Sequence, residues 1–338
     1  MRLYGNMILD SIAQSAFGLE IDSQDNPNSP FVEHAKDLLN INNANPRVLA
    51  VYLLPQLAPI FNYFNIGLFS YKAKQFFLDV TTHALNLRKD GKNKRVDVLQ
   101  LLADAQENHD PSSDSGEIPE LAGNKEKDSH TVMKKGLTKE ELMAQAMTFF
   151  LAGYETTRIA LSCLSYALAT NPNLQEKLYK EIQQAASTSE TLSYDAVNKI
   201  EYLEMFLNET LRLYPPGILA DRVCTEDITI NNIMFTKGTG LFYNIYSLHH
   251  DPKCWEDPEK FDPERFSKEN VDKIHPFAFL PFGTGPRNCI GMRFALLVVK
   301  TTLARVVQKF RFEPCEKTQV VMFVIFHLAT MTHIAMLW

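Results

Sequence analysis

The sequence predicts a mainly α-helical protein with a minor β part, and three observations lead to this prediction. Apolar residues recur at intervals of three and four over most of the 338 residues, as on one face of an α-helix. Stretches with strand character are short and lie between residues 228 and 243. The composition, 45% hydrophobic and 22% charged, can bury a large core, in one large helical domain or in two domains.

Most of the predicted elements are helices. The first stops at Gly18, and the longest opens with Thr138 and Glu141, which are spaced as in a capping box. This long helix continues to Asn171-Pro172 and, at about 1.5 Å per residue, measures about 45 Å. In chain order we expect helices over residues 3–17, 30–39, 70–88, 96–105, 138–170, 174–186, 200–214 and 290–310.

The remaining segments are strands, turns and loops. Short strands are expected over residues 228–230, 234–235 and 240–243, with Asn231-Asn232 as a turn. Residues 249–281 are rich in proline, aspartate and aromatic residues, which predicts an irregular but ordered coil. Residues 107–136 contain almost no apolar side chains and are expected to form a surface insertion or linker.

Charge and cysteine usage exclude several classes of function. The net charge is -6 and no basic stripe is present, so we expect no nucleic-acid partner. The five cysteines are scattered and show no C-x-x-C spacing, which argues against a disulfide framework and a zinc site. This usage fits a reducing compartment, such as the cytosol or the cytosolic face of a membrane.

Residues 320–338 form an atypical apolar tail that contains no Asp, Glu, Lys or Arg. Its nineteen residues would just reach across a bilayer core of about 30 Å. A packed pair of terminal strands is an alternative, and a non-native tail from aberrant splicing is the interpretation we favour. We therefore expect one domain over residues 1–319 and a separate tail over residues 320–338.

One ten-residue stretch, Phe282-Gly-Thr-Gly-Pro-Arg-Asn-Cys-Ile-Gly291, points most directly to chemistry. Its glycines let the backbone turn with positive φ and pass close to a flat partner. Cys289 lies just ahead of an apolar helical run, where the helix dipole favours a thiolate. A thiolate so placed suits the axial position of a haem iron. The alternative is a structural cysteine at an ordinary turn from loop to helix.

Two further patterns lie on predicted helices. Ala152-Gly-Tyr-Glu-Thr-Thr157 places small residues in mid-helix, which allows a flat ligand or a diatomic gas to approach, although glycine packing and a solvated glutamate would also explain it. Glu209 and Arg212 are three residues apart, so that both lie on one helical face; as an isolated surface pair they would contribute little.

Taken together, these motifs resemble those of the cytochrome P-450 superfamily, over nearly all of residues 1–319. The stretch 282–291 is similar to its haem-binding loop, 152–157 to its oxygen-binding helix, and Glu209-x-x-Arg212 to its Glu-x-x-Arg motif, with Arg265 at the place of that motif's partner arginine. Residues 149–157 and 286–295 look most like the drug-oxidising family three branch, with thromboxane synthase as its neighbour.

The resemblance implies a cytochrome P-450 fold and a haem b whose iron is bound by Cys289. It places Arg287 and Arg222 at the haem propionates; the alternative for Arg222, which we favour less, is a surface arginine. Thr156 and Glu155 would assist O2 activation, while Glu209, Arg212 and Arg265 would be structural. The other expected cofactor-binding residues are Phe282, Gly285, Gly291, Ala152 and Gly153. The candidates for the substrate side, which ordinary core packing would also explain, are Thr148, Leu151, Ile218 and Leu219.

The implied function is a monooxygenase that inserts one atom of O2 into a lipophilic steroid or xenobiotic. Its electrons would come from NADPH through NADPH–cytochrome reductase, with cytochrome b5 as a further partner. The implied location is the cytosolic face of the endoplasmic reticulum membrane, and membrane association is expected. The family's anchor and most of its N-terminal β-lobe are absent from this sequence, so the fold is expected to be incomplete. Two alternatives follow: a truncated, inactive or regulatory isoform that binds no haem, and a haem-thiolate isomerase of the thromboxane synthase type.

Overall fold

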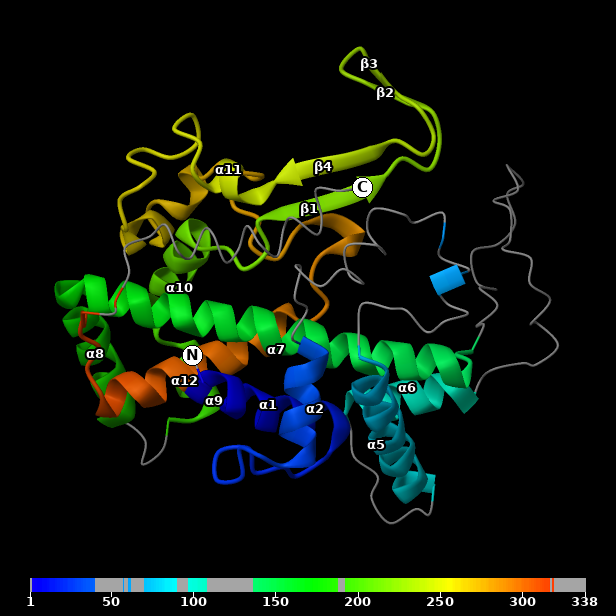
Figure 1. The fold of residues 1–338 in the computed structure, drawn as a ribbon. Helices are drawn as coiled ribbons and strands as arrows, with labels where there is room; N and C mark the ends of the chain where they lie inside the picture. Colours follow the sequence, from blue (N-terminus) through cyan, green and yellow to red (C-terminus); the bar gives the residue numbers. More distant parts are fainter. Residues whose placement is uncertain are drawn as a thin grey trace. The chain divides into compact units, whose positions relative to one another are not determined.

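The structure is a computed structural model that describes residues 2–39, 57, 60–61, 70–89, 97–107, 136–187, 192–316 and 318. It is mainly helical with a small β part, which confirms the predicted fold class (Figure 1). The expected tail over residues 320–338 and most of the expected linker over residues 107–136 lie outside the described residues. No helix in the described part of the chain is both long enough and apolar enough to cross a membrane.

Two compact units make up the described chain. The N-terminal unit contains residues 2–39, 70–89, 97–107 and 136–154, and the C-terminal unit contains residues 57, 60–61, 155–187, 192–316 and 318. The boundary between them falls within one helix, between Tyr154 and Glu155.

The N-terminal unit consists of helices around an aromatic core. They are α1 (Arg2–Phe17), α2 (Pro30–Leu39), α5 (Tyr71–Lys89), α6 (Val98–Glu107) and the first half of α7 (Lys139–Thr170). Phe150 of α7 is fully buried, and its ring centroid lies 4.8 Å from that of Phe77, 6.0 Å from Phe31 and 6.4 Å from Phe17. Aromatic pairs at such separations stabilise a core beyond their buried area alone.

Local sequence signals correctly predicted the end of α1 and the start of α7. Gly18 ends α1 with a φ of 66°, a conformation that glycine adopts without strain. The capping box of α7 is confirmed, because the Glu141 N–H donates to Thr138 Oγ1 at 3.1 Å and the Thr138 N–H donates to Glu141 Oε2 at 2.9 Å.

A buried ion pair joins α5 to the start of α6. Arg88 Nη2 donates to Asp97 Oδ2 at 2.7 Å and to the carbonyl of Phe17 at 2.9 Å. Asp97 Oδ1 also accepts from the Gln100 N–H at 2.9 Å, so it caps α6. The two charged side chains are 8% and 6% exposed.

Replacing Asp97 with alanine would leave the Arg88 charge buried without its counter-charge, with the Phe17 carbonyl as its remaining acceptor. We expect Asp97→Ala to lower the free energy of unfolding by about 3–5 kcal/mol, as measured by chemical denaturation. Asp104→Ala is the matched control, because Asp104 is an exposed acceptor on the same helix; we expect it to change stability by less than about 0.5 kcal/mol. Equal effects of the two substitutions would contradict the role given to Asp97.

The C-terminal unit has α10 (Glu201–Leu213) at its centre. This helix packs against α8 (Pro172–Ser187), α11 (Ile245–His249), α12 (Met292–Lys309) and the 3-10 turn Pro263–Phe266, while α9 (Tyr194–Asn198) packs against α8 and α12. Apolar residues of α10 are buried together with Glu209, Thr210 and Arg212. Polar residues on a buried face require partners, and these come from α10 itself, from His249 at the end of α11 and from the coil that follows.

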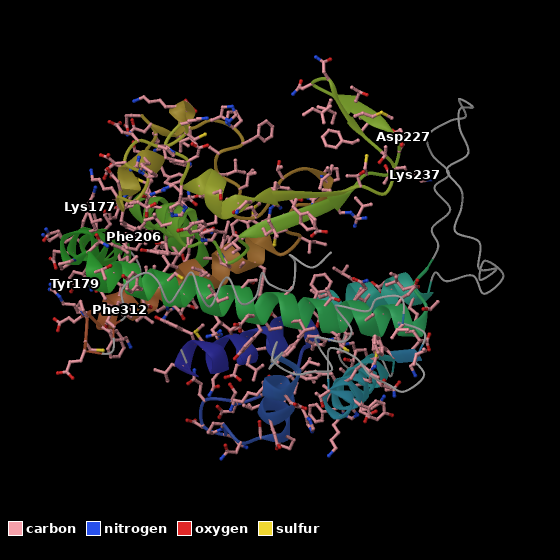
Figure 2. The ribbon with its side chains drawn as sticks, turned by 45° about the horizontal axis from the view of Figure 1, so that its top comes forward. Lys177, Tyr179, Phe206, Asp227, Lys237 and Phe312 are labelled. Carbon is pink, nitrogen blue, oxygen red and sulfur yellow. The ribbon has the colours of Figure 1, made fainter. Side chains whose placement is uncertain are left out.

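The β part consists of two small antiparallel pairs. β1 (Leu219–Val223) pairs with β4 (Gly240–Asn244), and β2 (Ile228–Ile230) pairs with β3 (Ile233–Phe235). Asn231 and Asn232 have φ values of 49° and 64°, as a tight two-residue hairpin turn requires, which confirms the predicted turn. At the base of this hairpin, Asp227 Oδ1 accepts from the Lys237 N–H at 2.7 Å (Figure 2).

Three short elements were not predicted, and one helix begins later than expected. β1 lacks alternating apolar residues, and α9 and α11 have five residues each, too few to show a periodicity. α12 begins at Met292 after the N-cap Gly291, not at Ile290, because a 3-10 turn over Gly285–Arg287 comes first. Cys289 therefore lies two residues before the N-cap, which corrects its expected place directly at the end of the helix.

Candidate functional site

A tight loop presents Cys289. Gly283 and Gly285 have φ values of 69° and 76°, where other residues would be strained, so glycine is required for the conformation of the loop. The Cys289 N–H donates to the carbonyl of Phe282 at 2.8 Å and closes the loop. A Cβ atom added to Gly291 would lie 4.0 Å from Cys289 Sγ, so the glycine leaves one side of the sulfur open.

Cys289 lines a largely apolar cavity of about 330 Å³ within the C-terminal unit. Its apolar wall comes from α7, α10 and α12, through Ala160, Leu207, Leu211, Leu296 and Val299 among others. The volume lies in the range of small-molecule and cofactor sites, about 300–1,000 Å³. The cavity therefore combines a thiol with an apolar interior.

Several residues that the sequence singled out line this same cavity. They come from segments far apart in the chain: Thr156, Leu219, Arg222, Phe282, Arg287 and Cys289. Arg222 on β1 lies over the ring of Tyr243, 5.7 Å from its centroid, and its Nη1 donates to the carbonyl of Asp221. Arg287 is exposed at the loop. The structure thus places two guanidinium groups at an apolar cavity that also contains a thiol.

Other predicted residues are not among those that line the cavity. Gly285 and Gly291 shape the loop around Cys289, and Ile218 accepts the N–H of Tyr246 through its carbonyl at 3.2 Å. The predicted residues Thr148, Leu151, Ala152 and Gly153 belong to the N-terminal unit. A Cβ atom on Gly153 would lie 3.0 Å from Ile12 Cδ1, which gives this glycine a packing reason; its place beside a cofactor stays a prediction.

Glu155 has a partner that the sequence reasoning missed. Arg158 Nε donates to Glu155 Oε2 at 2.9 Å, and Arg158 Nη2 forms a second short contact with Glu155 Oε1. Both side chains are partly buried, at 13% and 18% exposed, and such a bidentate pair fixes the orientation of the carboxylate. The spacing Glu155-x-x-Arg158 was a signal available in the sequence.

The surroundings of the cysteines differ. Cys163 lies in the buried face of α7, and burial raises the pKa of its thiol to about 12, so it stays protonated. Cys289 is exposed at the cavity. A thiolate ligand must give up its proton, and burial opposes this at Cys163.

Glu209 is the centre of a buried polar cluster. Its side chain is 0% exposed and receives Arg212 Nε at 2.8 Å, Arg212 Nη2 at 2.8 Å and the Asp262 N–H at 2.8 Å. Arg265 Nε lies 3.5 Å from Glu209 Oε1, and Arg265 Nη2 donates to the carbonyl of Asp257. Two guanidinium groups from different segments thus face one carboxylate.

Arg212 connects this cluster to the coil that precedes the cysteine loop. Its Nη1 donates to the carbonyl of His249 at 2.9 Å, its Nη2 donates to the carbonyl of Lys260 at 3.2 Å, and the ring of Trp255 covers its guanidinium carbon at 5.1 Å. His249 is also fully buried, and the sequence reasoning missed it. No local pattern identifies it, because its partners lie far away in the chain.

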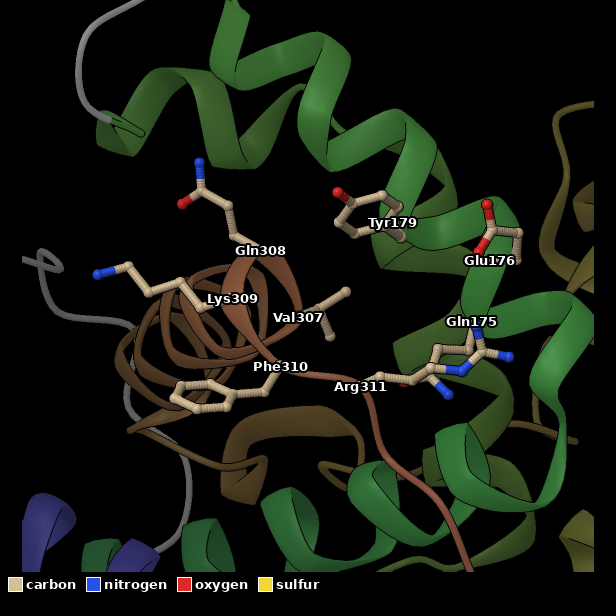
Figure 3. A pocket seen from close by; sticks show the side chains of 8 residues that line it. All are labelled: Gln175, Glu176, Tyr179, Val307, Gln308, Lys309, Phe310 and Arg311. Atoms are coloured by element: carbon tan, nitrogen blue, oxygen red, sulfur yellow. The ribbon is translucent and has the colours of Figure 1, made fainter.

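A second cavity, of about 260 Å³, lies between α8 and the end of α12 (Figure 3). Gln175 at its wall exchanges two hydrogen bonds with the backbone of Phe312, at 2.9 Å and 2.8 Å. The amide also donates to the carbonyl of Leu168, so its hydrogen-bonding groups are satisfied. We interpret this contact as an anchor for the segment after α12.

Comparison with known proteins decides the family. The family model for cytochrome P-450 matches residues 1–335. The chain belongs to the cytochrome P-450 family. Cytochrome P-450 3A29 of Sus scrofa is 44% identical over 319 residues, cytochrome P-450 3A7 of Homo sapiens 44% over 323 residues, and cytochrome P-450 3A41 of Mus musculus 43% over 317 residues. These alignments cover 94% of this chain and 59% of each relative, so the chain spans about three fifths of its relatives' length.

Haem is the prosthetic group of the cytochrome P-450 family, and the residues around the cavity fit it. A flat apolar macrocycle requires an apolar wall, its iron requires an axial donor, and its two propionates require cationic partners. The cavity offers apolar side chains, the thiol of Cys289 and the guanidinium groups of Arg222 and Arg287.

The Glu209 cluster gives a stability prediction. Arg212→Ala would leave Glu209 buried with the more distant Arg265 as its counter-charge, and we expect the free energy of unfolding to fall by about 3–5 kcal/mol. Lys268→Ala is the control, since Lys268 pairs with Glu201 at the surface and its loss should leave the melting temperature unchanged. Thermal unfolding followed by circular dichroism measures both. An unchanged melting temperature in Arg212→Ala would contradict the role of this pair.

Proposed function

We propose that this cytochrome P-450 chain comes from a haem-dependent monooxygenase that inserts one atom of O2 into a lipophilic substrate of steroid or xenobiotic type. The single observation that carries the proposal is the presence of Cys289, Thr156 and two arginines at one apolar cavity. The reaction consumes O2, two electrons and two protons, and it yields a hydroxylated product and water. The electrons come from NADPH through a reductase.

In this proposal Cys289 would supply its Sγ, as a thiolate, to the haem iron, and Arg222 and Arg287 would bind the propionates. The haem, when bound, supplies the oxygen chemistry, with the sulfur donor favouring O–O cleavage. Phe282, Gly285 and Gly291 shape the loop, and the apolar wall of α7, α10 and α12 excludes water. We also propose that Ala152 and Gly153, on the same helix as Thr156, lie beside the cofactor.

We further propose that Thr156 and Glu155 deliver protons. Thr156 lines the cavity, where its Oγ1 hydroxyl can hold a proton for oxygen reduction. Glu155 is oriented by Arg158, so its carboxylate has a fixed position from which to relay that proton. The role of Glu155 therefore depends on Arg158, which is on the same helix.

The remaining assignments concern substrate, partners and location. We place Thr148, Leu151, Ile218 and Leu219 on the substrate side; Leu219 lines the cavity. We propose NADPH–cytochrome reductase and cytochrome b5 as electron-transfer partners, and the cytosolic face of the endoplasmic reticulum membrane as the location. The support for these proposals is membership of the family together with the names of the relatives.

The first test concerns the thiolate. We expect Cys289→Ala to abolish the Soret band of a thiolate-bound haem in the CO-difference spectrum of the reduced protein, because no other thiol takes its place. Cys315→Ala is the control, since Cys315 is also exposed but lies on the segment after α12. A normal spectrum in Cys289→Ala would refute the proposed ligand, and no haem uptake by the unmodified chain would favour an inactive isoform.

The second test concerns the proton path. We expect Thr156→Ala to keep its haem spectrum but to release more hydrogen peroxide and less product for each NADPH consumed, because a proton no longer reaches the reduced oxygen. Thr170→Ala is the control, since Thr170 is an exposed threonine at the end of the same helix, bonded to the carbonyl of Tyr166. If Thr156→Ala couples NADPH to product as well as the control does, Thr156 has no part in proton delivery.

A further inference from the structure

His249 ends α11 and is completely buried, with a hydrogen bond at each ring nitrogen. Its Nε2 accepts the backbone N–H of Leu280 at 2.8 Å, and its Nδ1 lies 3.1 Å from the carbonyl oxygen of Arg212. A backbone N–H can only donate and a carbonyl can only accept, so Nδ1 carries the proton and the ring is neutral. Burial also lowers the pKa of His249 to about 4.

The bond to Leu280 leads directly to the cysteine loop. Leu280 is followed by Pro281, whose ring restricts φ, and then by Phe282, whose carbonyl accepts the Cys289 N–H at 2.8 Å. A continuous route thus starts at the Arg212 carbonyl on α10 and passes through the His249 imidazole to the Leu280 N–H. From Leu280 it follows the backbone to Phe282, whose carbonyl accepts the Cys289 N–H.

The other hydrogen bonds of this loop are local. In the described residues 280–291, the Gly283 N–H donates to Leu280 and the Asn288 N–H to Gly285, both within the loop. The far arm of the loop continues into α12, where the Met292 N–H donates to the carbonyl of Cys289 at 3.4 Å. The near arm, residues 280–282, is joined to another element by the hydrogen bond from the Leu280 N–H to His249 Nε2.

We propose that His249 is a positioning residue that holds the near arm of the cysteine loop through its Nε2, and thereby sets where Cys289 Sγ lies at the cavity. The proposal rests on Cys289 being the haem ligand, but the contact itself is a property of the protein chain. Because the Glu209–Arg212 pair also bonds the His249 carbonyl, the histidine connects that buried ion pair to the loop.

Two substitutions of His249 distinguish the contribution of Nε2 from that of Nδ1. The side-chain oxygen of glutamine reaches approximately the position of Nε2 and can accept the Leu280 N–H. Asparagine is one carbon shorter, so it can replace Nδ1 toward the Arg212 carbonyl but cannot reach Leu280. His250→Gln is the matched control, because His250 is adjacent but bonds the carbonyl of Tyr246 and stacks on that ring.

The first readout is amide hydrogen exchange on the full chain without haem, followed by mass spectrometry. We expect exchange over residues 280–289 to be about tenfold or more faster in His249→Asn, as for the loss of one buried hydrogen bond, and close to the unmodified rate in His249→Gln and His250→Gln. The second readout is the CO-difference spectrum of the haem-loaded protein. There His249→Asn should lose the thiolate band while His249→Gln keeps it.

The outcomes distinguish this proposal from the proposed function. Equal effects of His249→Asn and His249→Gln in hydrogen exchange, or failure of His249→Gln to fold, would overturn the positioning role of Nε2. If the exchange difference is found but the unmodified chain gives no thiolate band, the proposed function fails and the contact from His249 to the loop stands. A difference in exchange together with a matching difference in the spectrum would support both.

Discussion

The carboxylate of Glu209 is fully buried, and the contacts between α10 and the segment after α11 depend on the pairing of that charge. It takes two hydrogen bonds from Arg212, one from the Asp262 amide and an ion pair from Arg265. A buried charge is tolerated only when it is paired and its remaining acceptor positions are filled. Arg212 lies on the same helix, but Asp262 and Arg265 belong to the segment after α11, so this irregular segment is held in a defined position.

The buried Glu209–Arg212 pair is also connected to the loop that presents Cys289. Arg212 bonds the His249 carbonyl, His249 bonds the Leu280 amide, and Leu280 begins the loop that presents Cys289. The polar groups on this route are buried or partly buried, where hydrogen bonds are stronger and an unpaired group is most costly. In our proposal, the position of the thiol on its loop therefore depends on a charge in α10.

The side chains that line the cavity come from helices, a strand and a loop. Its apolar interior comes largely from α7, α10 and α12, while Cys289 and Arg287 come from a loop, Arg222 from β1 and Thr156 from α7. Helices hold their apolar side chains in regular positions, whereas the loop needs glycines with positive φ at Gly283 and Gly285 to bring Cys289 forward. A rigid wall with a few placed polar groups is the usual form of a small-molecule site.

The sequence alone determined the longer helices, the Asn231-Asn232 turn, the α7 capping box and the family, because periodicity, turn chemistry and motif spacing are local properties. It could not reveal β1, whose pairing partner β4 lies about twenty residues later, nor the short α9 and α11. It also indicated that Glu209 and Arg212 share a face, but not that both are fully buried. His249 was decided by the tertiary structure alone: its two partners lie 37 and 31 residues away, and only folding brings them to its ring.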